Sequence, residues 1–176
     1  KYDLLGLATL RTIQGAIYHV LKSQGVQEPD YQQVKDFYQK YLHPDNIDLD
    51  DQEVYKNIFH EGKWAGIFQF TEDNAQAFCQ KIKPTSIIDL AAITSIQRPG
   101  PLSAGVDKDY FSAKTNPEHI KYVSEAHESV TCETYGFLIF QEQIAMLAHT
   151  LGKDLSLDEG NMLRKVLTKK GTGKAA

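Results

Sequence analysis

Two residues stand out because their surroundings could put them to chemical use. Arg98 lies in the segment Gln97-Arg-Pro-Gly-Pro-Leu102, where two prolines stiffen the backbone and could present the guanidinium to a phosphate. Asp3 is an acid between apolar residues, at the end of a possible strand over residues 1–5. Taken alone, the first segment is most simply a connecting loop, and the carboxylate is most simply a surface or capping group.

A third candidate is the basic run near the carboxyl end, made of Arg164, Lys165, Lys169 and Lys170. On a helix, residues four apart lie one above the other, so Lys165 and Lys169 could line a phosphate track. Such a run can bind phosphates even on an acidic protein, because charges act over a Debye length of about 8–10 Å. The simpler alternative is a solvated, positively charged helix end.

The sequence lacks the motifs of several other common catalytic and metal-binding sites. The six histidines are scattered, with no HExxH and no metal-ligand spacing. No serine lies in a GxSxG turn, and Cys79 and Cys132 stand far apart without a CxxC. The stretch 171–175 resembles a phosphate loop only superficially, because it lacks the GxxxxGK[ST] spacing. A disulfide framework, a structural zinc and a small-molecule active site are therefore not expected.

The composition is that of an ordinary globular protein. The chain has 176 residues, 41% of them hydrophobic and 24% charged, which favours one domain with a core that needs no disulfide. The net charge of −4 argues weakly against a dedicated nucleic-acid binder, but acids gather in 43–61 and only bases occur in 161–176. With no long apolar run and no signal pattern, we expect a cytoplasmic protein without a membrane span. Because the chain starts at Lys1, we expect a piece of a longer protein.

Helical periodicity dominates the sequence, so the expected fold is mainly α with few short strands. Helices are predicted over 7–21 before Gly25, after Pro29-Asp30 up to Pro44, from Asp50, after a Ser86 cap, after Asn116-Pro117, over 141–151 before Gly152, and after a Ser156 cap. Short extended segments are predicted at 64–70 and 137–140, besides the strand end at 1–5. Residues 97–102 should break the chain, since two prolines around a glycine disfavour both helix and strand pairing. Trp64, Phe68 and Phe70 are expected in the core rather than stacked on bases.

Several short motifs then follow one another in the order found in one family. Lys1-Tyr-Asp-Leu-Leu-Gly-Leu7 resembles the K-F-D-F-L-G-L segment of bacterial C-family replicative DNA polymerases, the DNA polymerase III alpha subunits. The later matching segments are Ile47–Asp51, Gly66-Ile-Phe-Gln-Phe70, Lys83–Leu90, Arg98-Pro-Gly-Pro-Leu102, Thr134-Tyr-Gly136, Phe140-Gln-Glu-Gln143, and Leu163-Arg-Lys165 with Lys169-Lys170. The resemblance covers residues 1 to about 170. Each motif alone is weak evidence for the family, but this many motifs in the same order are not expected by chance.

The resemblance implies roles for the first residues. In this family, three palm aspartates hold two Mg²⁺ ions for attack of a primer 3′-hydroxyl on the α-phosphate of an incoming nucleotide. Asp3 matches the third of them, while the D-x-D pair would lie upstream of Lys1. Hard divalent ions prefer oxygen ligands, which fits a carboxylate set. Lys1, on the same strand face as Asp3, is expected near the triphosphate.

From residue 7 onward the match is to the helical fingers, so we divide the chain into the end of a palm strand, 1–6, and a fingers domain, 7–176. The resemblance implies that Arg98, Arg164, Lys165, Lys169 and Lys170 bind phosphates of the nucleotide or DNA. At 164–170 the family usually has R-R-A-M-G-K-K, whereas this chain has Arg-Lys-Val-Leu-Thr-Lys-Lys, with lysine in place of arginine at 165 and threonine in place of glycine at 168. Gln141 and Gln143 match the family's Q-E-Q motif. The only role that we assign to them is side-chain hydrogen bonding at the start of a helix.

The resulting expectation is a fragment of a DNA-directed DNA polymerase that is inactive on its own. Its partners would be primer-template DNA and deoxynucleoside triphosphates and, through the parent, the sliding clamp, the proofreading subunit and other replisome proteins. The alternative is a non-catalytic helical module that binds nucleic acid or protein.

Overall fold

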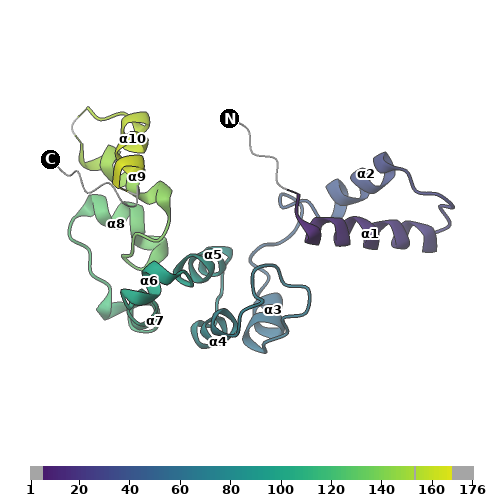
Figure 1. The fold of residues 1–176 in the computed structure, drawn as a ribbon, viewed down its shortest axis with the longest axis horizontal. Helices are drawn as coiled ribbons and strands as arrows, with labels where there is room; N and C mark the ends of the chain where they lie inside the picture. Colours follow the sequence, from purple (N-terminus) through teal and green to yellow (C-terminus); the bar gives the residue numbers. More distant parts are fainter. Residues whose placement is uncertain (1–5, 153, 168–176) are drawn as a thin grey trace.

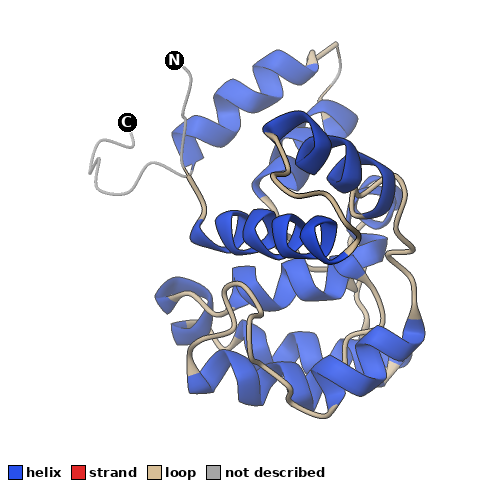
Figure 2. Cartoon of the chain, turned by 90° about the vertical axis from the view of Figure 1, so that its right-hand side faces the viewer, coloured by secondary structure: helices blue, strands red, loops and turns tan. Residues whose placement is uncertain are grey.

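The computed structural model describes residues 6–152 and 154–167, and in this part of the chain every regular element is helical (Figure 2). In chain order the elements are α1 (Ala8–Ser23), α2 (Tyr31–Tyr41), α3 (Gln52–Val54), the π-helical turn η1 (Tyr55–His60), α4 (Asp73–Ile82), α5 (Ile87–Ile96), α6 (Pro99–Ser103), α7 (Val106–Thr115), the 3₁₀ turn η2 (Pro117–His119), α8 (Glu125–Thr131), the 3₁₀ turn η3 (Cys132–Thr134), α9 (Gln141–Leu151) and α10 (Leu157–Leu167). The mainly-α prediction is confirmed.

Capping residues set many helix boundaries where the sequence places them. The Asp30 carboxylate accepts the Gln33 N–H at 2.8 Å, and the Gln33 side chain accepts the Asp30 N–H at 3.0 Å. The Ser86 hydroxyl accepts the Asp89 N–H at 3.1 Å. Gly25 follows α1 with a φ of 97°, a conformation that costs glycine little. The boundaries of α1, α2, α5, α9 and α10 therefore agree closely with prediction.

Helices α1 and α2 form a hairpin with a small core of its own, which projects from the rest of the described chain (Figure 1). Its core contains Ile17, Leu21 and Val34, with Ile13 and Phe37 packed against them. The main core lies among α4, α5, α7 and η1. Its buried members are Tyr55, Phe59, Phe70, Phe78, Cys79, Ile82, Ala92, Ile93, Ile96 and Tyr110.

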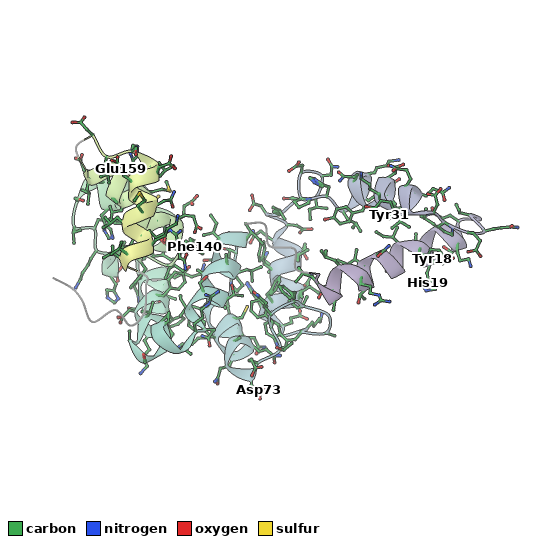
Figure 3. The ribbon with its side chains drawn as sticks, turned by 45° about the horizontal axis from the view of Figure 1, so that its top comes forward. Tyr18, His19, Tyr31, Asp73, Phe140 and Glu159 are labelled. Atoms are coloured by element: carbon green, nitrogen blue, oxygen red, sulfur yellow. The ribbon has the colours of Figure 1, made fainter. Side chains whose placement is uncertain are left out.

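The last helices pack onto this body as a pair. Helix α10 lies against α9, and α8 packs on both α9 and η3, as Figure 1 shows at the left of the molecule. The ring of Phe140, just before α9, packs against the main core and marks the junction between the pair and the body (Figure 3). The segment before α9 thus joins the pair to the body of the molecule.

Several local predictions are wrong. The prolines of segment 97–102 predict a break without helix, yet α6 begins at Pro99 with Arg98 as its N-cap. Prolines are accommodated there because the N–H groups of a first helical turn have no intrahelical acceptors to lose. The helix expected after Asn116-Pro117 is only the three-residue turn η2, and the capping residue before α3 is Asp51 rather than Asp50.

The two segments expected to be extended form turns instead. At 64–70, Gly66 and Gln69 adopt positive φ values of 79° and 64°, so the chain reverses tightly. At 137–140, the Phe137 N–H bonds back to the Thr134 carbonyl at 3.0 Å. Phe68 is 51% exposed and so lies outside the core, unlike Phe70, which is buried. The strand end predicted at 1–5 lies outside the described residues.

Candidate functional site

Two of the matched motifs meet where α9 and α10 pack together. The Arg164 guanidinium, in the last turn of α10, donates to the Gln141 side-chain oxygen at the start of α9 over 2.5 Å. The helices approach closely because Gly160 is buried with no side chain, and a Cβ there would lie 2.6 Å from the Ala145 carbonyl oxygen. The Q-E-Q and R-K motifs, distant in sequence, thus form one structural unit.

The second glutamine of the Q-E-Q motif locks the start of α9 to the preceding elements. The Gln143 side-chain oxygen accepts the N–H groups of Ile139 and Phe140 at 2.8 and 2.9 Å. Its amide nitrogen donates to the Val130 carbonyl at 3.1 Å and to the Thr134 hydroxyl at 2.8 Å. Gln143 is only 7% exposed, so these bonds form away from water and fix the direction of α9.

The solvent side of α10 carries Lys165 among apolar side chains. Lys165 is exposed, and so are the apolar side chains of Met162, Leu163, Val166 and Leu167, each of which is at least 44% exposed.

At the other end of α10, Ser156 and Glu159 cap each other, with the Ser156 N–H donating to the Glu159 carboxylate at 2.9 Å. Acid at the start and base at the end complement the helix dipole. Helix α10 therefore has a capped, acidic start and a basic end.

The main core holds a buried polar network centred on Asp89, which sequence reasoning missed. Asp89 is 1% exposed and pairs with the Lys114 ammonium at 2.5 Å. The same carboxylate accepts the Thr85 N–H at 2.9 Å and the hydroxyls of Tyr110 and Tyr135 at 3.3 Å each. The ion pair joins α5 to α7, and the hydrogen bond from Tyr135 adds the end of η3 to the same network. The available signal was an acid inside the apolar run Ile-Ile-Asp-Leu.

The network sets the protonation of its members. Burial alone would raise the pKa of Asp89, but the hydrogen bonds and charge of Lys114, with the Thr85 N–H, outweigh it and hold this pKa below its usual value. Burial, reinforced by the Asp89 charge, raises the pKa of Tyr110. Burial also raises the pKa of the Cys79 thiol to about 12. At neutral pH Asp89 is therefore ionised, while Tyr110 and Cys79 keep their protons.

The predicted site residues fall into three groups. Arg98 is exposed at the N-cap of α6, which packs on α7. Arg164 and Lys165 lie on α10, which packs on α9, so the two cationic segments belong to different packing units (Figure 1). The other four predicted residues, Lys1, Asp3, Lys169 and Lys170, lie outside the described residues.

Neither a metal-ligand cluster nor a membrane span occurs within the described ranges, 6–152 and 154–167. Among their side chains there is no group of three or more histidine, cysteine, aspartate or glutamate residues arranged to hold a metal ion. No helix within these ranges is both long and apolar enough to cross a membrane.

Known proteins share the family that the motif order indicates. Residues 29–176 match the model of the bacterial DNA polymerase III alpha subunit finger domain. DNA polymerase III subunits alpha of Helicobacter pylori strain J99 and Campylobacter jejuni are 32% and 31% identical over 170 residues, 97% of this chain and 13% of each relative. The same subunit of Staphylococcus aureus strain Mu50 is 31% identical, over 14% of its length. The chain thus spans about an eighth of these relatives, and it belongs to the family of DNA polymerase III alpha subunit finger domains.

Proposed function

We propose that this chain serves as the fingers of a longer DNA-directed DNA polymerase and presents cations to the phosphates of primer-template DNA and of an incoming deoxynucleoside triphosphate. The observation that carries the proposal is the Gln141–Arg164 hydrogen bond, because it joins two motifs of the family at one surface. Arginine suits a bidentate phosphate contact, and an exposed lysine beside it adds a point charge. Lys165 thus acts next to Arg164, on a pair of helices that Gln143 holds in place.

The remaining predicted residues complete this assignment. Arg98, Lys169 and Lys170 bind further phosphates, and Lys1 approaches the triphosphate. Asp3 supplies one of three carboxylates, the other two coming from the catalytic D-x-D segment of the parent polymerase, upstream of Lys1. With Mg²⁺ bound, such a set stabilises the charges on the attacking and leaving oxygens of nucleotidyl transfer. The described residues offer no metal-ligand group of three, so no chemical step is assigned to the chain by itself. The parent acts in the cytoplasm with the clamp, the proofreading subunit and other replisome proteins.

The isolated chain is expected not to extend DNA. Purified chain, mixed with primed template, deoxynucleoside triphosphates and Mg²⁺, should leave the primer at its starting length on a denaturing gel. A known polymerase serves as the positive control. Extension by the chain, retained after further purification, would contradict the assignment of Asp3 as one ligand of three.

DNA binding by the chain should depend on salt through the lysines near its carboxyl end. In fluorescence-anisotropy titrations with labelled primer-template, the logarithm of the binding constant should fall linearly with the logarithm of salt concentration. Replacing Lys165 or Lys169 by glutamine should reduce the slope by about one, because each variant neutralises one phosphate fewer. The matched control is Lys35→Gln, which makes the same charge change on the exposed surface of α2. Slopes for Lys165→Gln and Lys169→Gln equal to that of the control would place both lysines outside the DNA interface.

A further inference from the structure

A hollow of about 420 Å³ lies between the start of α4 and the junction of α5 with α6, away from the α9–α10 pair. Two separate stretches of the chain line it, and each includes part of a matched motif. Gln69, Thr71 and Asn74 come from the first stretch, and Thr94, Gln97 and Arg98 come from the second. Asp73, at the first turn of α4, marks this end of the helix in Figure 3.

Most of the polar side chains around this hollow have no partner within the described residues. The side-chain amides of Gln69, Asn74 and Gln97 make no hydrogen bond there, and neither does the hydroxyl of Thr71. The Thr94 hydroxyl, by contrast, donates to the Ala91 carbonyl at 2.9 Å. Three amides and a hydroxyl thus remain available to one ligand in the same hollow, next to the exposed guanidinium of Arg98.

Ring stacking and a hydrogen bond fix the backbone next to the hollow. The indole of Trp64 stacks on the ring of Phe70 with centroids 5.4 Å apart and planes within 6°. The Gln76 amide donates to the Phe70 carbonyl at 2.8 Å, which fixes the turn carrying Gln69 to helix α4. On the same helix Ala75 is buried, so Asn74 stands on an anchored turn. A ligand would therefore meet side chains that are carried on an anchored backbone.

The set of groups indicates the class of ligand. Arginine, threonine, asparagine and glutamine side chains are those that commonly hydrogen-bond phosphate oxygens in complexes with DNA. One opposing charge is present, because Glu72 also lines the hollow. We propose that the hollow is a second phosphate-binding subsite of the fingers, in which Arg98 and the amides hold one phosphate group and Glu72 weakens its binding. This inference rests on the proposed function and adds to it a defined pocket with its own residues.

Two isosteric substitutions of opposite charge test the subsite. Asn74→Asp adds a negative charge in the hollow, at a helix start where an acid is well tolerated, and should weaken phosphate binding. Glu72→Gln removes the opposing charge and should strengthen binding. We expect changes of about two- to fivefold in the dissociation constant, the range of single exposed charge interactions.

Matched controls separate a local effect from one of net charge. Gln39→Glu, on the exposed side of α2, makes the same charge change as Asn74→Asp. Glu133→Gln, exposed on η3, makes the same change as Glu72→Gln. Circular dichroism of each variant verifies that the fold is retained.

Two ligands distinguish the source of the phosphate. Each variant is titrated with labelled primer-template and, separately, with inorganic tripolyphosphate in a calorimeter. Opposite effects of Asn74→Asp and Glu72→Gln on DNA alone assign the subsite to the DNA backbone, and the same effects on tripolyphosphate alone assign it to the nucleotide. Variants that match their controls with both ligands overturn the subsite, while the proposed function stands if Lys165→Gln still weakens DNA binding. A wild-type chain that binds neither ligand overturns both proposals.

Discussion

Replacing Lys114 by methionine is expected to lower the free energy of unfolding by about 3–5 kcal/mol near neutral pH. The substitution leaves the stem of the side chain in place but removes the ammonium from Asp89, whose side chain is 2% exposed. A buried carboxylate without its counterion costs far more than the ion pair itself contributes. Urea unfolding followed by helical circular dichroism measures the difference.

The control for this prediction is Lys108→Met, on the exposed side of the same helix, which should change stability by less than about 0.5 kcal/mol. In the Asp89→Asn background, Lys114→Met should lower the free energy of unfolding much less than in the wild type, because no buried negative charge then loses its counterion. Equal losses from Lys114→Met and Lys108→Met would show that the Asp89 network is not a stabilising centre.

The effect of pH on this pair has a definite sign. Because the pKa of Asp89 is lowered in the folded protein, its contribution to stability is present above the unfolded value of about 4 and is lost as pH falls through the folded value. The destabilisation caused by Lys114→Met should therefore narrow as the pH falls towards the folded pKa of Asp89, because protonation removes the charge that the variant leaves unpaired. A loss that stays constant down to pH 3 would show that the charge on Asp89 is not its cause.

Two glycine-to-alanine substitutions should act in opposite directions. Gly160→Ala should lower the free energy of unfolding by about 1–3 kcal/mol, because the new Cβ would meet the backbone of Ala145 at 2.6 Å and force α10 off α9. Gly15→Ala, in the middle of α1, has nothing within 4 Å of its Cβ and should raise stability by up to about 1 kcal/mol through helix propensity.

The two variants control for each other in thermal and urea unfolding. They share the same gain in intrinsic helix propensity, so any difference between them reports on packing. Gly160→Ala should also weaken DNA binding, because displacing α10 separates Arg164 from Gln141. A Gly160→Ala protein as stable as Gly15→Ala would contradict the close packing of α9 and α10.

Much of the secondary structure could be predicted because its determinants are local. The caps at Asp30, Ser86 and Ser156 and the glycines at 25 and 152 lie within a few residues of the groups they satisfy. Pro99 and Pro101 mislead a prediction from sequence, because proline is incompatible with a helix interior but is accommodated in a first turn, which is where both lie in α6.

The site was harder to predict because its partners are distant in sequence. Asp89 is separated from Lys114 by 25 residues and from Tyr135 by 46, and no spacing rule links them. Likewise, Gln141 and Arg164 are 23 residues apart and meet only because two helices pack closely. Motif order pointed to the right family, but the part each residue plays in the structure follows from tertiary packing.

The most direct test of the central claim is a map of backbone amide shifts in the chain as primer-template DNA is added. The claim is that the cationic end of α10 faces the phosphates of the nucleic acid. We therefore expect the largest shifts in residues 161–167, and these shifts should diminish when salt is added. Saturable DNA binding that leaves this segment unshifted would contradict the account.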